Sequence, residues 1–326
     1  MSVTLIPQLG AASTLTLDEA LACLHHLHDS YAVIPNHATT ATSDMLQQIR
    51  TTADDAGLHT VGQLLTASSS LVSKVAGVSN VTAFHNDANS AALHLARNGL
   101  AALATAAYVA NGWAPSVAYH ALPRLKMRTH FYRRPLEDDE ILLCRLHALH
   151  LILTGSPSQR RNGAAFVVAD AGLPPTEATA LRTDDLVLDG SQALLMMAAS
   201  RSFQDRILAL QPFHAAALRA HVEHLGGNLI AYQPRKQTPG SNAAAASMHG
   251  VLGRLLDSVG IAADDLTAAC VYTWGLRRIL DHEGVAEALL AAGLAPDAAG
   301  TLLRLVGHAD DRPTTPSTTP ELESGF

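Results

Sequence analysis

Apolar positions recur at helical spacing through the first 120 residues. The run 16-TLDEALACLHHLHDSYAVI-34 opens the pattern, and Thr16 with Glu19 makes a capping-box signature at its start. Further helical segments are predicted at 41–56, 60–75 and 87–111. No strand-like alternation interrupts them. The pattern therefore predicts an all-helical N-terminal domain over residues 16–119, preceded by an arm at 1–15.

The pattern changes at 120-HALPRLKMRTHFYRRPLEDDE-140, which is basic and contains two prolines. Both features are typical of an interdomain linker, which we place at 120–135. A new helix is predicted after Pro135, because the acidic run 137-EDDE-140 suits the positive end of a helix dipole. This helix continues through 141–153.

The second half mixes helices with a few strands. A helix is predicted at 162–171, and 185-DLVLDGSQALLMMA-198 has the pattern of two strands joined by an Asp-Gly turn. A third strand is expected at 206–210. Further helices are predicted at 212–227, 243–259, 272–283 and 285–309. We therefore expect a mainly α fold with a small β-sheet: an α+β domain over 136–311, followed by a disordered Pro/Thr-rich tail at 312–326.

Charge adds a local feature to this picture. The net charge of −7 and the pI near 6.2 do not indicate a strongly basic nucleic-acid binder. Binding depends on local patches, however, and the segment 124–161 concentrates basic residues. These are Arg124, Lys126, Arg128, Arg133, Arg134, Arg145, Arg160 and Arg161.

The three cysteines, Cys23, Cys144 and Cys270, lie far apart and form no CxxC pair. This spacing is typical of free, buried thiols in a reducing compartment. The N-terminus shows no basic segment followed by an apolar run, and no stretch of about 18 apolar residues occurs. We therefore expect a cytoplasmic protein with no membrane partner.

Several short motifs occur in a fixed order. The run 171-AGLPPTEATALRTDDL-186 matches G-L-R-x-x-E-x-x-x-L-x-x-x-D at Gly172, Leu173, Glu177, Leu181 and Asp185. It is preceded by 133-RRPLEDDEILLCR-145 and followed by 200-SRSFQDRILAL-210, 272-YTWGLRRIL-280 and 305-LVGH-308. Over about residues 16–312 this order resembles the tyrosine recombinases, or phage-type integrases. The resemblance implies a helical core-binding-like domain, a linker and an α+β catalytic domain, in a bacterial DNA recombination or integration setting.

The resemblance also implies a chemistry. In this family a tyrosine attacks a DNA phosphodiester, two Arg and a His or Trp neutralise the charge, a Lys protonates the leaving oxygen, and a second His assists. The family's positions that keep a suitable residue are Arg277, His308, Arg201 and Trp274. Arg201 lies near the Lys position, and its high pKa makes it a poor general acid.

The site is degenerate at two other positions. Pro174 replaces the first Arg, and two successive prolines suit a helix start but cannot bind a phosphate. The nucleophile position falls on Ser317, and no tyrosine follows Tyr272. We therefore expect that strand cleavage has been lost.

The resemblance implies double-stranded DNA as a partner, with an active recombinase or a second copy of the chain as further candidates. The DNA-binding residues would be Arg124, Lys126, Arg128, Arg133, Arg134, Arg160 and Arg161. No cofactor is expected. The 17 histidines include pairs at i, i+3 spacing, but no Cys or acidic partner completes a ligand pattern, so no metal site is predicted.

Three functions remain open. The first is a DNA-binding, recombinase-like protein without cleavage, and the second is an active recombinase with a divergent site. The third is a protein–protein interaction scaffold without DNA binding, which the net charge favours. Structural roles are also open for several residues: Glu177 and Asp185 as cap and turn residues, Arg277 on a solvated helix face, and Trp274 in the core.

Overall fold

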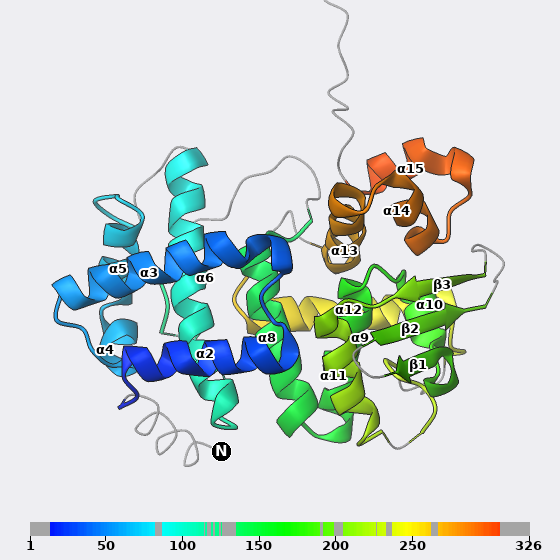
Figure 1. Ribbon diagram of the computed structural model, residues 1–326, viewed down its shortest axis with the longest axis horizontal. Helices are drawn as coiled ribbons and strands as arrows, with labels where there is room; N and C mark the ends of the chain where they lie inside the picture. Colours follow the sequence, from blue (N-terminus) through cyan, green and yellow to red (C-terminus); the bar gives the residue numbers. More distant parts are fainter. Residues whose placement is uncertain are drawn as a thin grey trace, which may run out of the picture.

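The computed structural model describes residues 14–81, 87–113, 115, 119, 121–123, 125, 135–189, 192–198, 205–225, 227–232, 237–261 and 267–306. Figure 1 shows two adjoining halves with one helix, α8, between them. The N-terminal half contains α2 to α6, and the C-terminal half contains α9 to α15 with the sheet.

The N-terminal half is entirely helical in its described residues. Thr16 begins α2 as predicted: its Oγ1 accepts from the Glu19 N–H at 3.2 Å, and a Glu19 carboxylate oxygen accepts from the Thr16 N–H at 2.7 Å. The single helix expected at 60–75 is instead two, with a break at Ala67. The elements are α2 (Leu17–Tyr31), η1 (Asn36–Ala38), α3 (Thr39–Asp55), α4 (Val61–Thr66), α5 (Ser68–Val75) and α6 (Asp87–Ala110).

The central helix α8 (Asp138–Thr154) is buried on nearly every side, because it packs on both α6 and α9. Its run 141-ILLCRLHAL-149 is buried at every position. Such a helix, apolar all round, belongs inside a fold rather than on its surface. One continuous hydrophobic core extends from α2 to α15 as a result. The predicted boundary at 120–135 lies largely outside the described residues and stays a prediction.

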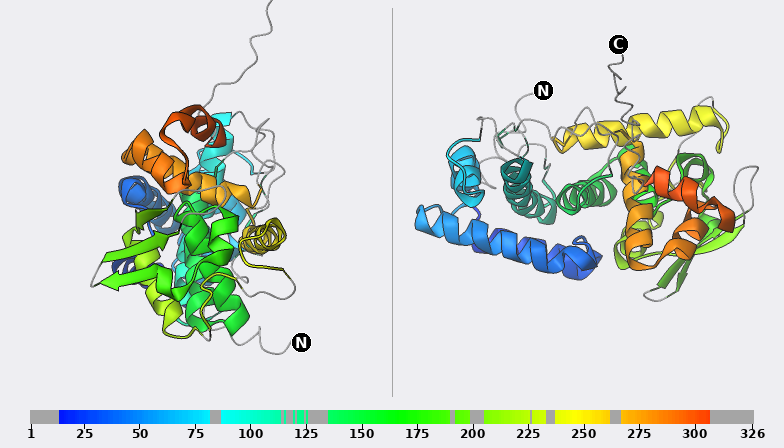
Figure 2. Two further views of the ribbon diagram at one scale, coloured as in Figure 1. Left: turned by 90° about the vertical axis from the view of Figure 1, so that its right-hand side faces the viewer. Right: turned by 90° about the horizontal axis from the view of Figure 1, so that it is seen from above.

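The C-terminal half surrounds a small sheet with helices. Its elements are α9 (Pro157–Asp170), α10 (Pro175–Ala180), η2 (Thr183–Asp185), β1 (Leu186–Asp189), β2 (Gln192–Met197), β3 (Arg206–Ala209), α11 (Pro212–Val222), α12 (Asn242–Ser258), α13 (Ala269–His282), α14 (Val285–Ala292), η3 (Pro296–Ala298) and α15 (Ala299–Leu305). In both views of Figure 2, α12 lies along the outside of the molecule. It packs on α8, α9 and α10.

The three strands form an antiparallel sheet in the order β1-β2-β3, so the three predicted strands are confirmed. Leu195 and Leu208 pair across β2 and β3 and face the core. The neighbouring pair, Met196 and Ile207, faces outward. The fold is thus mainly α with a small sheet, as expected.

The single helix predicted at 285–309 is wrong. The helix α14 ends at Ala292, and Gly293 follows with φ 65°, a left-handed conformation that favours glycine. Pro296 then opens η3 before α15 begins. Within the described residues no single helix has the length and hydropathy to cross a bilayer; only α14 taken with Pro296–Leu305 does, and that pair is bent by 108°.

Candidate functional site

The motif at 171–186, called the first motif below, begins a helix as predicted, because its two prolines occupy the start of α10. Pro174 is the N-cap residue and Pro175 the first helical residue, where no backbone N–H is required. Gly172 precedes them with φ 92°, which a residue with a side chain rarely adopts. Leu173 between them is buried in the core. A helix therefore begins at this motif, with Pro174 where the resemblance implies an Arg.

Helix α13 packs directly on this motif. Gly275 makes the approach possible: a Cβ atom there would lie 2.3 Å from the Asp170 carbonyl oxygen and 2.7 Å from the Gly172 nitrogen. A Cβ on Gly172 would in turn lie 3.2 Å from the Leu276 side chain. Two motifs about 100 residues apart in the sequence thus contact one another at the end of α9.

The two α13 residues named from the sequence have different environments. The Trp274 side chain is buried, with 5% of its surface exposed. The Arg277 side chain is 44% exposed, and its Nε lies 3.5 Å from the Asp281 carboxylate one turn on. Arg277 is thus on a solvated helix face, and Trp274 belongs to the core.

A buried ionic cluster lies beneath Trp274. The Arg145 guanidinium donates to both carboxylate oxygens of Asp170, at 2.8 and 3.4 Å, and both side chains are almost fully enclosed. The Cζ atom of Arg145 lies 4.6 Å from the Phe213 ring centroid and 5.3 Å from the Trp274 ring centroid. Its third donor reaches the Val33 carbonyl at 3.5 Å. Arg145 therefore connects the N-terminal half to α9, α11 and α13.

Protonation within this cluster follows from burial and charge. Burial alone raises the pKa of Asp170, but the adjacent Arg145 guanidinium opposes this, and the pKa of Asp170 is well below its ordinary value. Burial lowers the pKa of His214, and Asp170 only partly opposes this. The His214 Nε2 lies 3.2 Å from Asp170, yet among the described residues that nitrogen has no partner with hydrogen-bond geometry. We therefore treat His214 as neutral and Arg145 as the cation that balances Asp170.

A second buried ion pair joins the first motif to the sheet. Arg206 on β3 donates through both terminal nitrogens to the Glu177 carboxylate on α10, one of them at 2.8 Å. It also donates to the Ala291 carbonyl on α14 at 3.0 and 3.2 Å. Glu177 therefore has a pairing role rather than a capping role. Asp185 does act as a turn residue, since it accepts from the Arg182 N–H at 2.8 Å.

The N-terminal half contacts α13 through His37. Its Nε2 lies 2.9 Å from an Asp138 carboxylate oxygen at the start of α8. The His37 ring centroid is 4.5 Å from that of His282 and 6.4 Å from that of Trp274. His37 thus brings the N-terminal half close to Trp274 and His282 on α13.

The remaining sequence-derived positions divide into two groups. Arg124, Lys126, Arg128, Arg133, Arg134, Arg201, His308 and Ser317 lie outside the described residues. Arg160 and Arg161 are described and lie on the first turns of α9, whereas α13 packs at the other end of that helix. Arg160 and Arg161 are therefore not brought together with Arg277.

Sequence analysis missed the two buried ion pairs. Arg145 had a detectable signal, since it is a lone charge in the apolar run 141-ILLCRLHALHLIL-153. A charge in a helix that is buried all round needs an acidic partner. The described residues contain no group of three or more His, Cys, Asp or Glu that could hold a metal ion.

Among known proteins, the likeness found is to solved structures. No family model matches the chain, and no curated protein matches it. The structure of XerA recombinase is 13% identical, with a TM-score of 0.43, and the match covers 90% of this chain and 95% of that chain. A lambda integrase dimer bound to a COC′ core site is 14% identical, with a TM-score of 0.39 and coverage of 96% of this chain and 84% of that chain. XerH site-specific recombinase bound to palindromic difH substrate, in a post-cleavage complex, is 12% identical, with a TM-score of 0.42 and coverage of 91% of this chain and 94% of that chain. At TM-scores below 0.5 the likeness does not establish a common fold or function.

Proposed function

We propose that this protein is a tyrosine-recombinase-like DNA-binding protein that does not cleave DNA. The observation that carries the proposal is the contact between the first motif and α13 at Gly275. The sequence resemblance requires these two motifs to meet, although they are far apart in the chain. Their contact supports the resemblance independently of any comparison with solved structures.

Arg277 is the residue best suited to a phosphate. Its guanidinium is half exposed on α13, and its contact with Asp281 is a surface ion pair. Such pairs contribute little free energy, about 0–1 kcal/mol, so a phosphate can replace the carboxylate at low cost. The planar guanidinium also suits two-point hydrogen bonding to a phosphate.

Cleavage is excluded in this proposal by the missing groups. Pro174 offers no charge where the first Arg would stand, and Trp274 is enclosed between Arg145 and the core. Tyr272, the last tyrosine of the chain, is partly buried, and burial raises its pKa. Loss of one charge-stabilising donor costs about 10²–10³ in rate, whereas loss of the nucleophile removes the covalent step entirely.

The remaining parts of the proposal concern its setting. We place the protein in the cytoplasm, with double-stranded DNA as its partner and an active recombinase or a second copy as further partners. Arg201 and His308 are proposed as remnants of the ancestral site, and the arginines and lysine of 124–134 as phosphate contacts. The domain division at 120–135 belongs to the same proposal.

Binding to duplex DNA at graded salt concentrations tests this function. Arg277→Gln removes one phosphate contact and is expected to reduce the salt slope of log K by about 1. Arg50→Gln is a matched control, since Arg50 is 43% exposed and pairs with Asp18 at 2.9 Å on the surface. Equal effects of the two variants would argue against a specific role for Arg277.

A second candidate function, a protein–protein scaffold, is favoured by the outer face of the sheet. Met196 and Ile207 are cross-strand neighbours there, with 49% and 56% of their surface exposed. An antiparallel sheet usually presents polar residues to water on its open face. A folded protein that binds no duplex at about 50 mM salt would favour this second function.

A further inference from the structure

Basic side chains gather at the end of the C-terminal half where α9 begins and α11 ends. Asp170 at the end of α9 contacts His214 at the start of α11, at 3.2 Å. Arg160 and Arg161, on the first turns of α9, act electrostatically on His221 in the last turn of α11. The two helices are therefore antiparallel. We call Arg160, Arg161 and His224 the distal basic patch.

The charge of this patch is positive on balance. The first turn of α9 contains no acidic residue, and Glu223 is the carboxylate at the end of α11. Burial lowers the pKa of His221, the hydrogen bond to the Ile230 carbonyl partly opposes this, and the nearby Arg161, Arg160 and His224 lower the pKa further. The Arg160 Nε donates to the Gly155 carbonyl at 2.9 Å, which holds this guanidinium at the end of α8. Arg160 is thus held in a fixed position within the patch.

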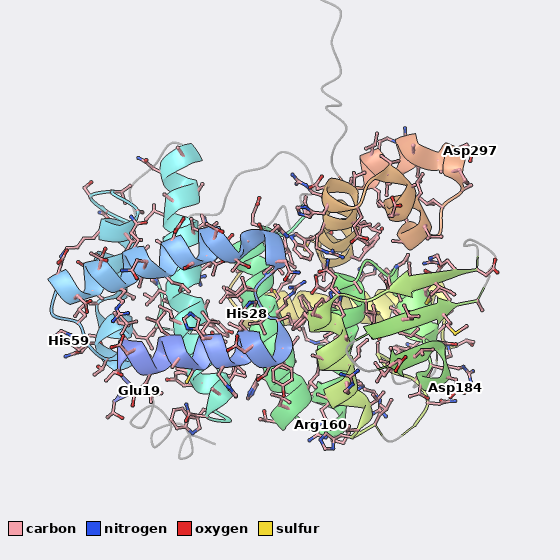
Figure 3. All side chains as sticks on the ribbon, viewed as in Figure 1. Glu19, His28, His59, Arg160, Asp184 and Asp297 are labelled. Carbon is pink, nitrogen blue, oxygen red and sulfur yellow. The ribbon has the colours of Figure 1, made fainter. Side chains whose placement is uncertain are left out.

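The patch is separate from the Arg277 region. Asp170 is ten positions after Arg160 on α9, which corresponds to about 15 Å along the helix. Figure 3 shows Arg160 at the lower end of the C-terminal half, whereas α13 is at its upper side. The distal basic patch and Arg277 therefore face different parts of the molecular surface.

The surroundings of the patch distinguish between two kinds of anionic partner. The exposed large hydrophobic side chains of the described residues lie on α6, the strands, α14 and α15, and none lies on α9 or α11. Protein interfaces usually have an apolar centre, whereas binding to a nucleic-acid backbone depends mainly on charge. Arginine is also well suited to phosphate geometry. The patch therefore fits phosphates better than an acidic protein surface.

We propose that the distal basic patch is a second surface for the phosphate backbone of a nucleic acid. It goes beyond the proposed function, because it requires no contact at α13. A protein with two such surfaces can contact two duplex segments, or two parts of one bent duplex. The number of phosphates contacted then exceeds what the α13 region supplies alone.

The test is the salt dependence of binding to a fluorescent, mixed-sequence duplex of about 20 bp, with the full-length chain. Arg160→Gln with Arg161→Gln is expected to reduce the salt slope by about 2, both in the wild-type background and in an Arg277→Gln background. The control pair, Arg50→Gln with Lys74→Gln, removes the same charge from the N-terminal half and should leave the slope unchanged. Because Arg160 also binds Gly155, Arg161→Gln alone is measured as well and should reduce the slope by about 1.

The outcomes separate the two proposals. An unchanged slope in the Arg160/Arg161 variant, or an equal loss in the control pair, would overturn the distal surface and leave an acidic protein as the alternative ligand. A loss on Arg277→Gln with no loss on Arg160/Arg161 replacement would keep the proposed function alone. A reduced slope on replacement of Arg160 and Arg161, with no change on Arg277→Gln, would support the distal surface and contradict the role of Arg277.

Discussion

Glu177 and Arg206 form a buried ion pair that connects the helix of the first motif to the third strand. The Glu177 carboxylate accepts hydrogen bonds from both terminal nitrogens of Arg206, and Arg206 also donates to the Ala291 carbonyl. Three elements, α10, β3 and α14, thus meet at one guanidinium. Since removal of one partner leaves a charge buried and unpaired, this pair should matter for stability.

Glu177→Ala should lower the free energy of unfolding by about 3–5 kcal/mol, because Arg206 would remain buried without its counter-ion. The double replacement Glu177→Leu with Arg206→Met should cost clearly less, since no charge is left. Urea unfolding of Glu177→Ala, of the single variants Glu177→Leu and Arg206→Met, and of the double variant measures this. Additive losses would show that the pair is not coupled.

Gly275→Ala should be strongly destabilising, since the new Cβ would meet backbone atoms of Asp170 and Gly172 that cannot move cheaply. We expect a loss of about 3 kcal/mol, at the upper end for an overpacked core. Gly253→Ala on α12 is the control: its Cβ would meet nothing within 4 Å, and it should gain about 0.5–1 kcal/mol. Thermal melting of both variants checks the contrast, and a neutral Gly275→Ala would contradict the close packing.

His147 should make the protein less stable in acid. Burial, with a smaller effect of His150, lowers its pKa to about 4, and its Nε2 lies 3.0 Å from the Ser258 hydroxyl. The unfolded chain takes up a proton at this residue below about pH 6.5, whereas the folded protein does so only near pH 4. Stability is therefore complete above about pH 6.5 and falls between the two values, by on the order of 3 kcal/mol.

His147→Gln removes this titration. Its unfolding free energy should fall less between pH 7 and about pH 4.5 than that of the wild type. Identical pH profiles for wild type and His147→Gln would show that His147 is not the source of the effect.

No covalent protein–DNA adduct should form on a nicked suicide duplex, because the chain has no tyrosine after Tyr272. Denaturing electrophoresis of the protein with labelled duplex measures this. A labelled band that migrates with the protein and resists denaturation would instead support a divergent active recombinase. Loss of that band on Ser317→Ala would identify its nucleophile.

The helices were predictable where local signals determine them. Thr16 with Glu19 fixes the start of α2, and the consecutive prolines fix the start of α10, because both act within one turn. The breaks at Ala67 and Gly293 were missed, since apolar spacing continues across each of them. At the second break Gly293 and Pro296 were visible in the sequence and should have outweighed the periodicity.

The site was less predictable because its contacts join distant segments. The pairing of Arg145 with Asp170 and that of Glu177 with Arg206 depend on helix packing, which no local pattern specifies. Trp274 could be assigned to the core or to a phosphate, and only the position of Arg145 beneath it decides for the core. Arg160 and Arg161 appeared continuous with the basic linker in sequence, yet α9 places them at the end away from α13.

The most direct test of the central claim is the binding of the purified, folded protein to mixed duplex DNA as a function of salt. We predict binding at about 50 mM salt that weakens steeply toward about 200 mM, as counterions compete for the phosphates. Absence of binding at about 50 mM salt, with the protein shown to be folded, would contradict it. The fold would then serve a protein partner, and its resemblance to recombinases would reflect ancestry alone.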